Sequence, residues 1–253
     1  MLETKRLDDF RVVLISPLYS GNVGSVARLA MNFGVRDVVL VNPGCDPLDA
    51  EAQKFACKLS QQMLRSFRIV DSVAAAIADC TSVVGFSRRT GEFRMADVTL
   101  DALLSLQRRG KIALVFGRED NGISRDEILQ CTHVCSIPSS SDCPSLNLSH
   151  AVAVVLSHLF AFQENSELQT QISGPSQEEM PASAEAFEEF MAHWRETLVA
   201  VGLTKAGNPQ RMMPHLRRIF QRARVTDKDV RLVRVFLGNA LAAVGARTRR
   251  KTL

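Results

Sequence analysis

The sequence lacks the features of a membrane protein or of a disulfide-stabilised secreted protein. No apolar run in its 253 residues approaches the roughly 20 residues that a membrane span needs. The N-terminus, MLETKRLDDF, has no apolar stretch of the signal-peptide type. The six cysteines form no CxxC pair, and the alternation of Cys131, His133 and Cys135 is more typical of a buried strand than of a metal site. We therefore expect a cytoplasmic protein with reduced thiols, no membrane partner and no metal.

Two nucleotide-binding fingerprints are also absent. A dinucleotide fold needs G-x-G-x-x-G after the first strand and a carboxylate further along for the ribose hydroxyls. Here the spacing is Gly21-x-x-Gly24, and the second apolar run ends in Val41, Asn42 and Pro43 without an acid. A Walker A loop would need Gly-Lys-Ser/Thr, which does not occur. These absences exclude the usual NAD-dependent and P-loop chemistries.

Short apolar runs alternate with amphipathic stretches between residues 12 and 162. The runs predict strands over Val12–Ser16, Asp37–Asn42, Phe67–Val70, Ser82–Phe86, Ile112–Phe116 and His133–Ile137. The stretches predict helices over Val23–Phe33, Asp49–Ser60, Val73–Asp79, Leu100–Gln107, Arg125–Gln130 and Leu148–Phe162. Continuous rather than alternating apolar strands are typical of a parallel sheet buried under helices. We therefore expect an α/β fold with a parallel sheet.

A change in composition follows this region. The segment from Gln163 to Glu185 is polar and contains Gly174, Pro175 and Pro181, which is typical of a linker. After it, apolar residues recur at helical spacing, and Thr226 with Asp229 resembles a capping box at the start of a last helix. Pro214 can begin a helix but hardly lie inside one. We predict a first domain over 1–163, a linker over 164–182 and a small all-α domain over 183–253.

Charge is divided unevenly between these parts. From Lys205 onward there are 13 Lys and Arg against two acids, a balance of +11. The first 204 residues hold 18 bases and 25 acids, a balance of −7. A basic region joined to an acidic body indicates a polyanionic partner, and a solvated basic face is the alternative.

Three segments in which small or polar residues interrupt an apolar stretch carry the functional information. They are NVGSVAR (Asn22–Arg28), LVFGRE (Leu114–Glu119) and SLNLSHAVAVV (Ser145–Val155). Each is weak alone, but in order and spacing they resemble motifs one, two and three of the SPOUT superfamily of RNA methyltransferases, in the branch that methylates ribose 2′-hydroxyls. The match covers about residues 10 to 162. The tail from Phe187 to Leu241 is similar to the C-terminal domain of a bacterial tRNA-methylating member of that superfamily.

The resemblance implies a fold, a reaction and partners. It implies a trefoil knot in the C-terminal part of the sheet domain, a homodimer with its sites near the interface, and S-adenosylmethionine as methyl donor. The implied substrate is a cytidine or uridine ribose of tRNA at position 32, the nucleotide that opens the anticodon loop, with no role for DNA. The alternatives are the same chemistry on ribosomal RNA, or a non-catalytic RNA-binding protein of the same fold.

The resemblance also assigns cofactor-binding residues to three loops. They are Phe86, Ser87 and Arg88 in the first loop, Gly117 in the second, and Ile137, Pro144, Ser145 and Leu146 in the third. Gly117 is expected to let the backbone approach the ligand closely. Phe86 and Arg88 stand where the family pattern suggests small residues. Plain core packing is the alternative role for Ile137 and Leu146.

Arg28 corresponds to the family's catalytic arginine. Because the guanidinium pKa lies above about 12, arginine is a poor base. We expect Arg28 to hold the target phosphate and to stabilise a developing alkoxide, whereas a role as base would need strong perturbation. Asn22 and the glycine-turn amides are expected to meet a phosphate of the RNA. In the basic tail the tRNA-binding candidates are Arg217, Arg218, Arg222 and Arg224.

Overall fold

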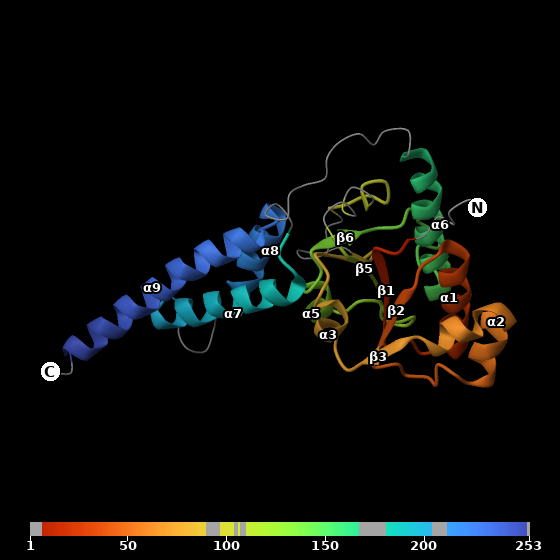
Figure 1. Cartoon of the computed structure of the whole chain (residues 1–253), viewed down its shortest axis with the longest axis horizontal. Coiled ribbons are helices and arrows are strands. Elements are labelled where there is room, and N and C mark those ends of the chain that lie inside the picture. Colours follow the sequence, from red (N-terminus) through yellow and green to blue (C-terminus); the bar gives the residue numbers. More distant parts are fainter. Residues whose placement is uncertain are drawn as a thin grey trace. The chain divides into compact units, whose positions relative to one another are not determined.

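The structure, a computed structural model, describes residues 7–89, 97–103, 106, 110–166, 181–203 and 212–251, with the side chains of 163–166 and 245–251 left aside. The chain divides into two compact units, Met1–Gly174 (unit 1) and Pro175–Leu253 (unit 2) (Figure 1). The predicted linker, 164–182, lies mostly outside the described residues, so its bounds stay a prediction.

Unit 1 is built on a six-stranded sheet. Its strands are β1 (Phe10–Ile15), β2 (Asp37–Val41), β3 (Arg68–Val70), β4 (Ser82–Phe86), β5 (Ile112–Phe116) and β6 (His133–Cys135). Their order is β3-β2-β1-β5-β4-β6, and every pairing is parallel. The predicted parallel α/β sheet is therefore confirmed, and each strand lies where an apolar run predicted it. β6 ends two residues earlier than expected because Ile137 already belongs to a loop.

Helices cover both faces of this sheet. They are α1 (Ser20–Phe33), α2 (Ala50–Arg65), α3 (Val73–Ile77), α5 (Arg125–Ile128) and α6 (Leu148–Ser166). Figure 1 shows α1, α2 and α6 together on one side and α3 and α5 on the other. The core between sheet and helices is aliphatic, with Leu14, Leu40, Leu114 and Leu156 fully buried. The predicted helix at 100–107 falls only partly within the described residues.

The two glycines of the first motif serve helix packing. α1 begins at Ser20 rather than at Val23, so Gly21 and Gly24 lie inside the helix and not in an open turn. A Cβ at Gly24 would come within 2.0 Å of the carbonyl oxygen of Ala52 in α2. The expectation of a glycine turn is therefore wrong. The absence of side chains at these positions lets α2 pack directly on α1.

A buried arginine joins the amino ends of the central strands. Arg11 of β1 is 3% exposed and donates to the carboxylate of Asp37 at 2.8 Å and to both carboxylate oxygens of Asp79 at 2.5 and 3.0 Å. It also donates to the carbonyl oxygen of Ala76 at 2.6 Å. Lys111 binds the same two carboxylates at 3.3 and 3.2 Å. This ion cluster satisfies a buried charge that would otherwise strongly destabilise the sheet.

Unit 2 consists of three helices in the described residues, α7 (Ala184–Ala200), α8 (Met213–Ala223) and α9 (Asp227–Lys251). Phe190, Trp194 and Phe220 pack in its core at centroid distances of 4.9 to 6.5 Å. The predicted capping box is confirmed, since Thr226 and Asp229 exchange side-chain-to-backbone hydrogen bonds. Pro214 lies in the first turn of α8, as predicted. None of the helices in the described part of the chain combines the length and apolar character of a membrane span.

The ion cluster makes the stability of unit 1 depend on pH. The hydrogen bond from Arg11 is the largest cause that holds the pKa of the Asp79 carboxyl below its usual range. A depressed pKa stabilises the fold above the unfolded value of about 4, and this stabilisation is lost as the pH falls through the folded value. We expect Asp79→Asn to lower the free energy of unfolding by about 1 kcal/mol at neutral pH and to flatten its decline below pH of about 4.

The measurement is denaturant unfolding at several pH values, followed by far-ultraviolet circular dichroism. Trp194 is the single tryptophan of the chain and lies in unit 2, so its fluorescence follows that unit separately. Asp71→Asn is the matched control, because Asp71 is exposed. Parallel pH curves for the wild type and Asp79→Asn would show that the cluster adds nothing to stability.

Candidate functional site

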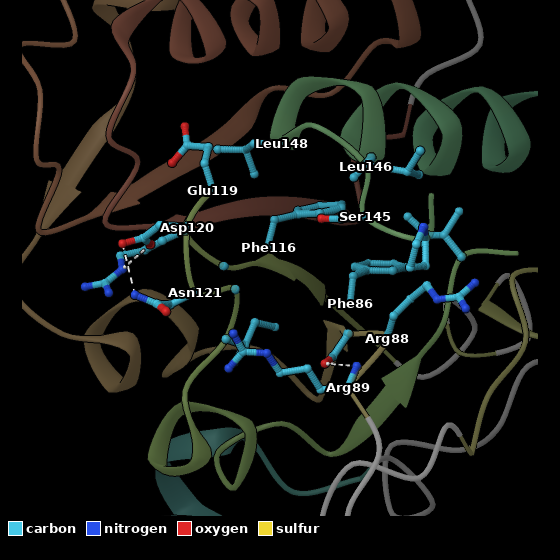
Figure 2. A pocket seen from close by; sticks show the side chains of 18 residues that line it. Phe86, Arg88, Arg89, Phe116, Glu119, Asp120, Asn121, Ser145, Leu146 and Leu148 are labelled. Carbon is cyan, nitrogen blue, oxygen red and sulfur yellow. Dashed lines mark hydrogen bonds and ion pairs between the residues drawn. The ribbon is translucent and has the colours of Figure 1, made fainter. Parts of the chain in front are cut away.

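A pocket of about 410 Å³ opens at the carboxyl ends of β4, β5 and β6 (Figure 2). Parallel strands bring their carboxyl ends to one edge of the sheet, where loops can form a crevice. Three loops line it: the one after β4, the one after β5, and the one that leads from β6 into α6. All eight residues that the resemblance assigned to the cofactor line this pocket: Phe86, Ser87, Arg88, Gly117, Ile137, Pro144, Ser145 and Leu146.

One wall of the pocket is aromatic and aliphatic. The rings of Phe86 and Phe116, from the ends of the adjacent strands β4 and β5, stack with centroids 4.6 Å apart and an angle of 9° between planes. Ile137, 7% exposed, and Leu146, 37% exposed, add aliphatic surface. Ser145 lines the same pocket and is labelled in Figure 2. This wall suits a flat, weakly polar group.

Arg88 fastens the third loop. Its guanidinium Nη1 donates to the carbonyl oxygen and to the hydroxyl oxygen of Ser139 at 3.0 and 2.9 Å. The Ser139 hydroxyl donates in turn to the carbonyl oxygen of Pro144 at 3.0 Å. Asn147 caps α6 by accepting from the Ser149 amide at 2.9 Å. Of the two polar residues that precede α6, Ser145 therefore faces the pocket, and Asn147 has a helix-capping role.

Glu119 joins the second loop to the start of α1. One carboxylate oxygen accepts from the side-chain amide of Asn22 at 2.8 Å, and the other accepts from the backbone amide of Leu18 at 2.9 Å. Asn22 is 8% exposed. The Asn22 amide N–H is therefore committed to Glu119, and the side chain is buried rather than presented to a partner at the surface. Two motifs that lie 97 residues apart meet through this bond.

Gly117 has a different reason to be glycine than the sequence suggested. A Cβ at this position would lie 2.1 Å from the carbonyl carbon of Gly122 and 2.3 Å from the amide nitrogen of Ile123. The close approach is thus to the chain's own backbone, because the loop folds back with Gly122 donating to the Arg118 carbonyl at 2.8 Å. Gly117 also lines the pocket, so the expectation that it lets the backbone approach a ligand closely stays a prediction.

Arg28 does not line the pocket of its own chain. It lies on the exposed face of α1 and makes no hydrogen bond or ion pair with any residue that the structure describes. The pKa of the Cys57 thiol in α2 is lowered, mainly by a backbone hydrogen bond from Leu59. The positive charge of Arg28 contributes to the same shift. The structure therefore separates the predicted catalytic residue from the predicted cofactor residues.

The four tail arginines fall into two groups. Arg217 is 15% exposed at its side chain, binds both carboxylate oxygens of Glu188 and lies over the ring of Phe187 at 5.6 Å. Arg218 is half-buried, whereas Arg222 and Arg224 are exposed around the end of α8. Arg217 therefore has a structural role in unit 2, because its two terminal nitrogens bind the Glu188 carboxylate and its guanidinium lies over Phe187.

Sequence reasoning missed several residues of the pocket. Phe116, Arg118, Asp120, Asn121, Ile123 and Leu148 all line it. The signal was present in the run Asp120-Asn121-Gly122 directly after a buried strand, since such runs mark tight turns. In the structure Gly122 has a φ of 61°, and Asp120 accepts from both Arg118 and Asn121.

Two family models match the chain. Residues 9–157 match the SpoU rRNA Methylase family, and residues 185–251 match the tRNA methyltransferase TrmJ, C-terminal domain. The chain is 34% identical over 242 residues to the tRNA (cytidine/uridine-2′-O-)-methyltransferase TrmJ of Salmonella choleraesuis strain SC-B67. That alignment covers 92% of this chain and 96% of the relative.

Solved structures agree in fold. TrmJ from Z. mobilis ZM4 has a TM-score of 0.75 at 24% identity and covers 90% of this chain and 97% of its own. The SpoU methyltransferase AviRb from Streptomyces viridochromogenes, in complex with the cofactor AdoMet, has a TM-score of 0.51 at 20% identity over 63% and 60% of the two chains. With a family match over residues 9–157 and a 34% identical relative along nearly its whole length, the chain belongs to the SpoU rRNA methylase family.

Proposed function

We propose that this chain transfers a methyl group from S-adenosylmethionine to a ribose 2′-hydroxyl of a cytidine or uridine in tRNA. The observation that carries the proposal is the likeness to tRNA (cytidine/uridine-2′-O-)-methyltransferases along both units, 34% identical over 92% of the chain. The match of residues 185–251 to the TrmJ C-terminal domain supports tRNA rather than ribosomal RNA as substrate. The modified nucleotide in this proposal is position 32, and the reaction takes place in the cytoplasm.

The chemistry of the pocket fits the cofactor. S-Adenosylmethionine combines a flat adenine with cationic and carboxylate groups. The stacked Phe86 and Phe116 offer a surface for the adenine, and the loop backbone offers hydrogen bonds. Asp120 and Glu119 supply negative charge and Arg89 positive charge at the same pocket. When bound, the cofactor supplies an electrophilic methyl group, and the pocket residues must position it and exclude water.

Arg28 is proposed to serve the pocket of a second copy. It is exposed on α1, outside its own pocket, and Met31 one turn later is an exposed apolar neighbour with 51% of its surface accessible. In the homodimer that the family resemblance implies, this face of α1 would meet the partner subunit. There the guanidinium would hold the phosphate of the target nucleotide and stabilise the alkoxide as the hydroxyl loses its proton.

The trefoil knot also belongs to the proposal. After β5 the chain passes β4 to form β6 at the sheet edge, and α6 then packs on α1 above the central strands. This path supports a knot at the pocket, although knots are very rare in proteins.

Nucleoside mass spectrometry tests the proposed function. The full chain is incubated with S-adenosylmethionine and unmodified tRNA transcripts, and the digested RNA is searched for 2′-O-methylcytidine and 2′-O-methyluridine. We expect at least one of these two methylated nucleosides, at position 32 of the tRNA. Modification of ribosomal RNA alone would reassign the substrate, and cofactor binding without any methylated nucleoside would favour the non-catalytic alternative.

Arg28→Ala is expected to lower methyl transfer at least about 100-fold, because a preorganised charge on the developing alkoxide is lost. Cofactor affinity, measured by calorimetry, should change less than about threefold, since Arg28 does not line the pocket. Arg65→Ala is the control, an exposed arginine in α2. Loss of cofactor binding in Arg28→Ala would contradict this assignment.

Complementation tests the proposed role in trans. Leu146→Trp fills the pocket, so Arg28→Ala and Leu146→Trp should each be inactive as purified proteins. Co-expressed, they should recover about a quarter of wild-type activity, because half of the dimers are mixed and each mixed dimer has one intact site. No recovery in mixed dimers of demonstrated composition would place Arg28 in its own subunit's site.

Arg222 and Arg224 are expected to contact tRNA phosphates. Replacing both by Gln should weaken tRNA binding about tenfold and reduce the salt dependence by roughly 1.5 to 2 in the slope of log K against log salt. Binding is measured by fluorescence anisotropy at several salt concentrations. Arg234→Gln is the control, since Arg234 is paired with Glu189 at 2.9 Å. An unchanged salt slope in the double variant would remove these two arginines from the RNA contact.

A further inference from the structure

The third loop of the pocket, which leads from β6 into α6, has little packing of its own. Residues 137–146 form no helix or strand, and the chain is exposed throughout residues 140–147. Ile137, at the start of the loop, is 7% exposed and packs against the core. Pro144, Ser145 and Leu146, near its end, nevertheless line the pocket. Because an exposed segment with few buried apolar contacts opens easily, the order of this loop must depend on other contacts.

Arg88 of the first loop supplies such contacts. Its Nη1 atom carries two N–H groups, and it donates to the carbonyl oxygen and to the hydroxyl oxygen of Ser139 at 3.0 and 2.9 Å. The Ser139 hydroxyl then donates its own hydrogen to the carbonyl oxygen of Pro144 at 3.0 Å. In the described part of the chain, no other hydrogen bond joins residues 137–146 to a different element. The wall of the pocket at Pro144 is thus connected to the first loop through Ser139.

The charge of Arg88 is not neutralised by the acids of the pocket. Figure 2 shows Arg88 on the opposite side of the pocket from Glu119 and Asp120. Arg88 forms no ion pair with any carboxylate that the structure describes. Hydrogen bonds from a charged donor are stronger than those between neutral groups. The bonds to Ser139 are therefore well suited to hold an exposed loop.

We propose that Arg88 is a positioning residue for cofactor binding, which acts through Ser139 on the loop wall at Pro144–Leu146 and does not itself contact the cofactor. The inference rests on the proposed function, since it takes S-adenosylmethionine as the ligand. It replaces the direct contact that the family resemblance assigned to Arg88. A loop that is ordered in advance lets the ligand bind without the entropic cost of ordering it. Because the family pattern suggests a small residue at this position, the tie is a feature of this chain.

Two ligands distinguish positioning from direct contact. S-Adenosylmethionine carries a carboxylate in its amino-acid portion, and 5′-methylthioadenosine has the adenine and ribose without that portion. We expect Arg88→Ala to weaken the binding of both by about tenfold, because the loop that both ligands use has lost a charge-assisted tie. Binding is measured by calorimetry on the full chain, with circular dichroism as a check of the fold. Weaker binding of S-adenosylmethionine alone would show a guanidinium–carboxylate contact and overturn the proposal.

Ser139→Ala tests the route through the loop, since it leaves Arg88 in place and removes the bond to Pro144. We expect about fivefold weaker binding of both ligands, and little further loss when it is combined with Arg88→Ala, because both changes break one link. Ser141→Ala is the matched control in the same loop. Its exposed hydroxyl contacts the neighbouring Asp142 at 3.5 Å and neither Arg88 nor Pro144. Unchanged affinity in Ser139→Ala, or full additivity in the double variant, would overturn the proposal.

Hydrogen exchange without any ligand separates this inference from the proposed function. The backbone amides of residues 140–147 should exchange at least about five times faster in Arg88→Ala and Ser139→Ala than in the wild type or Ser141→Ala. Equal exchange in all four proteins would show that Arg88 does not order the loop. Failure of the wild type to bind either ligand would overturn the proposed function and the role in cofactor binding, whereas the exchange rates would still establish the tie between the two loops.

Discussion

The parallel pairing of β5 with β1 and β4, and of β4 with β6, is the constraint on which the pocket depends. It brings the loops after three separate strands to one edge of the sheet, where they point the same way. The loop contacts then fix the details. Glu119 binds the start of α1, Arg88 binds the loop before α6, and the Phe86–Phe116 stack closes the gap between neighbouring strands.

The strands of this sheet could be predicted from the sequence, but the side-chain contacts between its elements could not. Strands such as Ser82–Phe86 and Ile112–Phe116 were predicted with correct bounds, because continuous apolar runs flanked by polar residues leave little choice. The bond between Asn22 and Glu119 could not be predicted, since it joins residues 97 positions apart. Gly24 was misinterpreted for the same reason: what makes it glycine is a carbonyl of α2.

The site residues were predicted from family resemblance, whereas the fold was predicted from the pattern of apolar residues. No periodicity in the sequence pointed to Ile137 or Leu146, and family resemblance supplied them; the structure then placed them together in one pocket. Arg217 illustrates the opposite case. A basic residue in a basic region suggests a phosphate contact, but its partner Glu188 lies 29 positions earlier, so only the folded unit reveals that the charge is already paired.

The ion cluster around Arg11 lies at the amino ends of the strands, whereas the pocket lies at their carboxyl ends. The ion pairs that stabilise the sheet and the pocket therefore lie at opposite edges of the same sheet. Loops at the pocket edge can exchange residues, lengthen or shorten without disturbing the charges that secure the strands. Such a division lets the pocket change at one edge of the sheet while the ion pairs at the other edge continue to stabilise the fold.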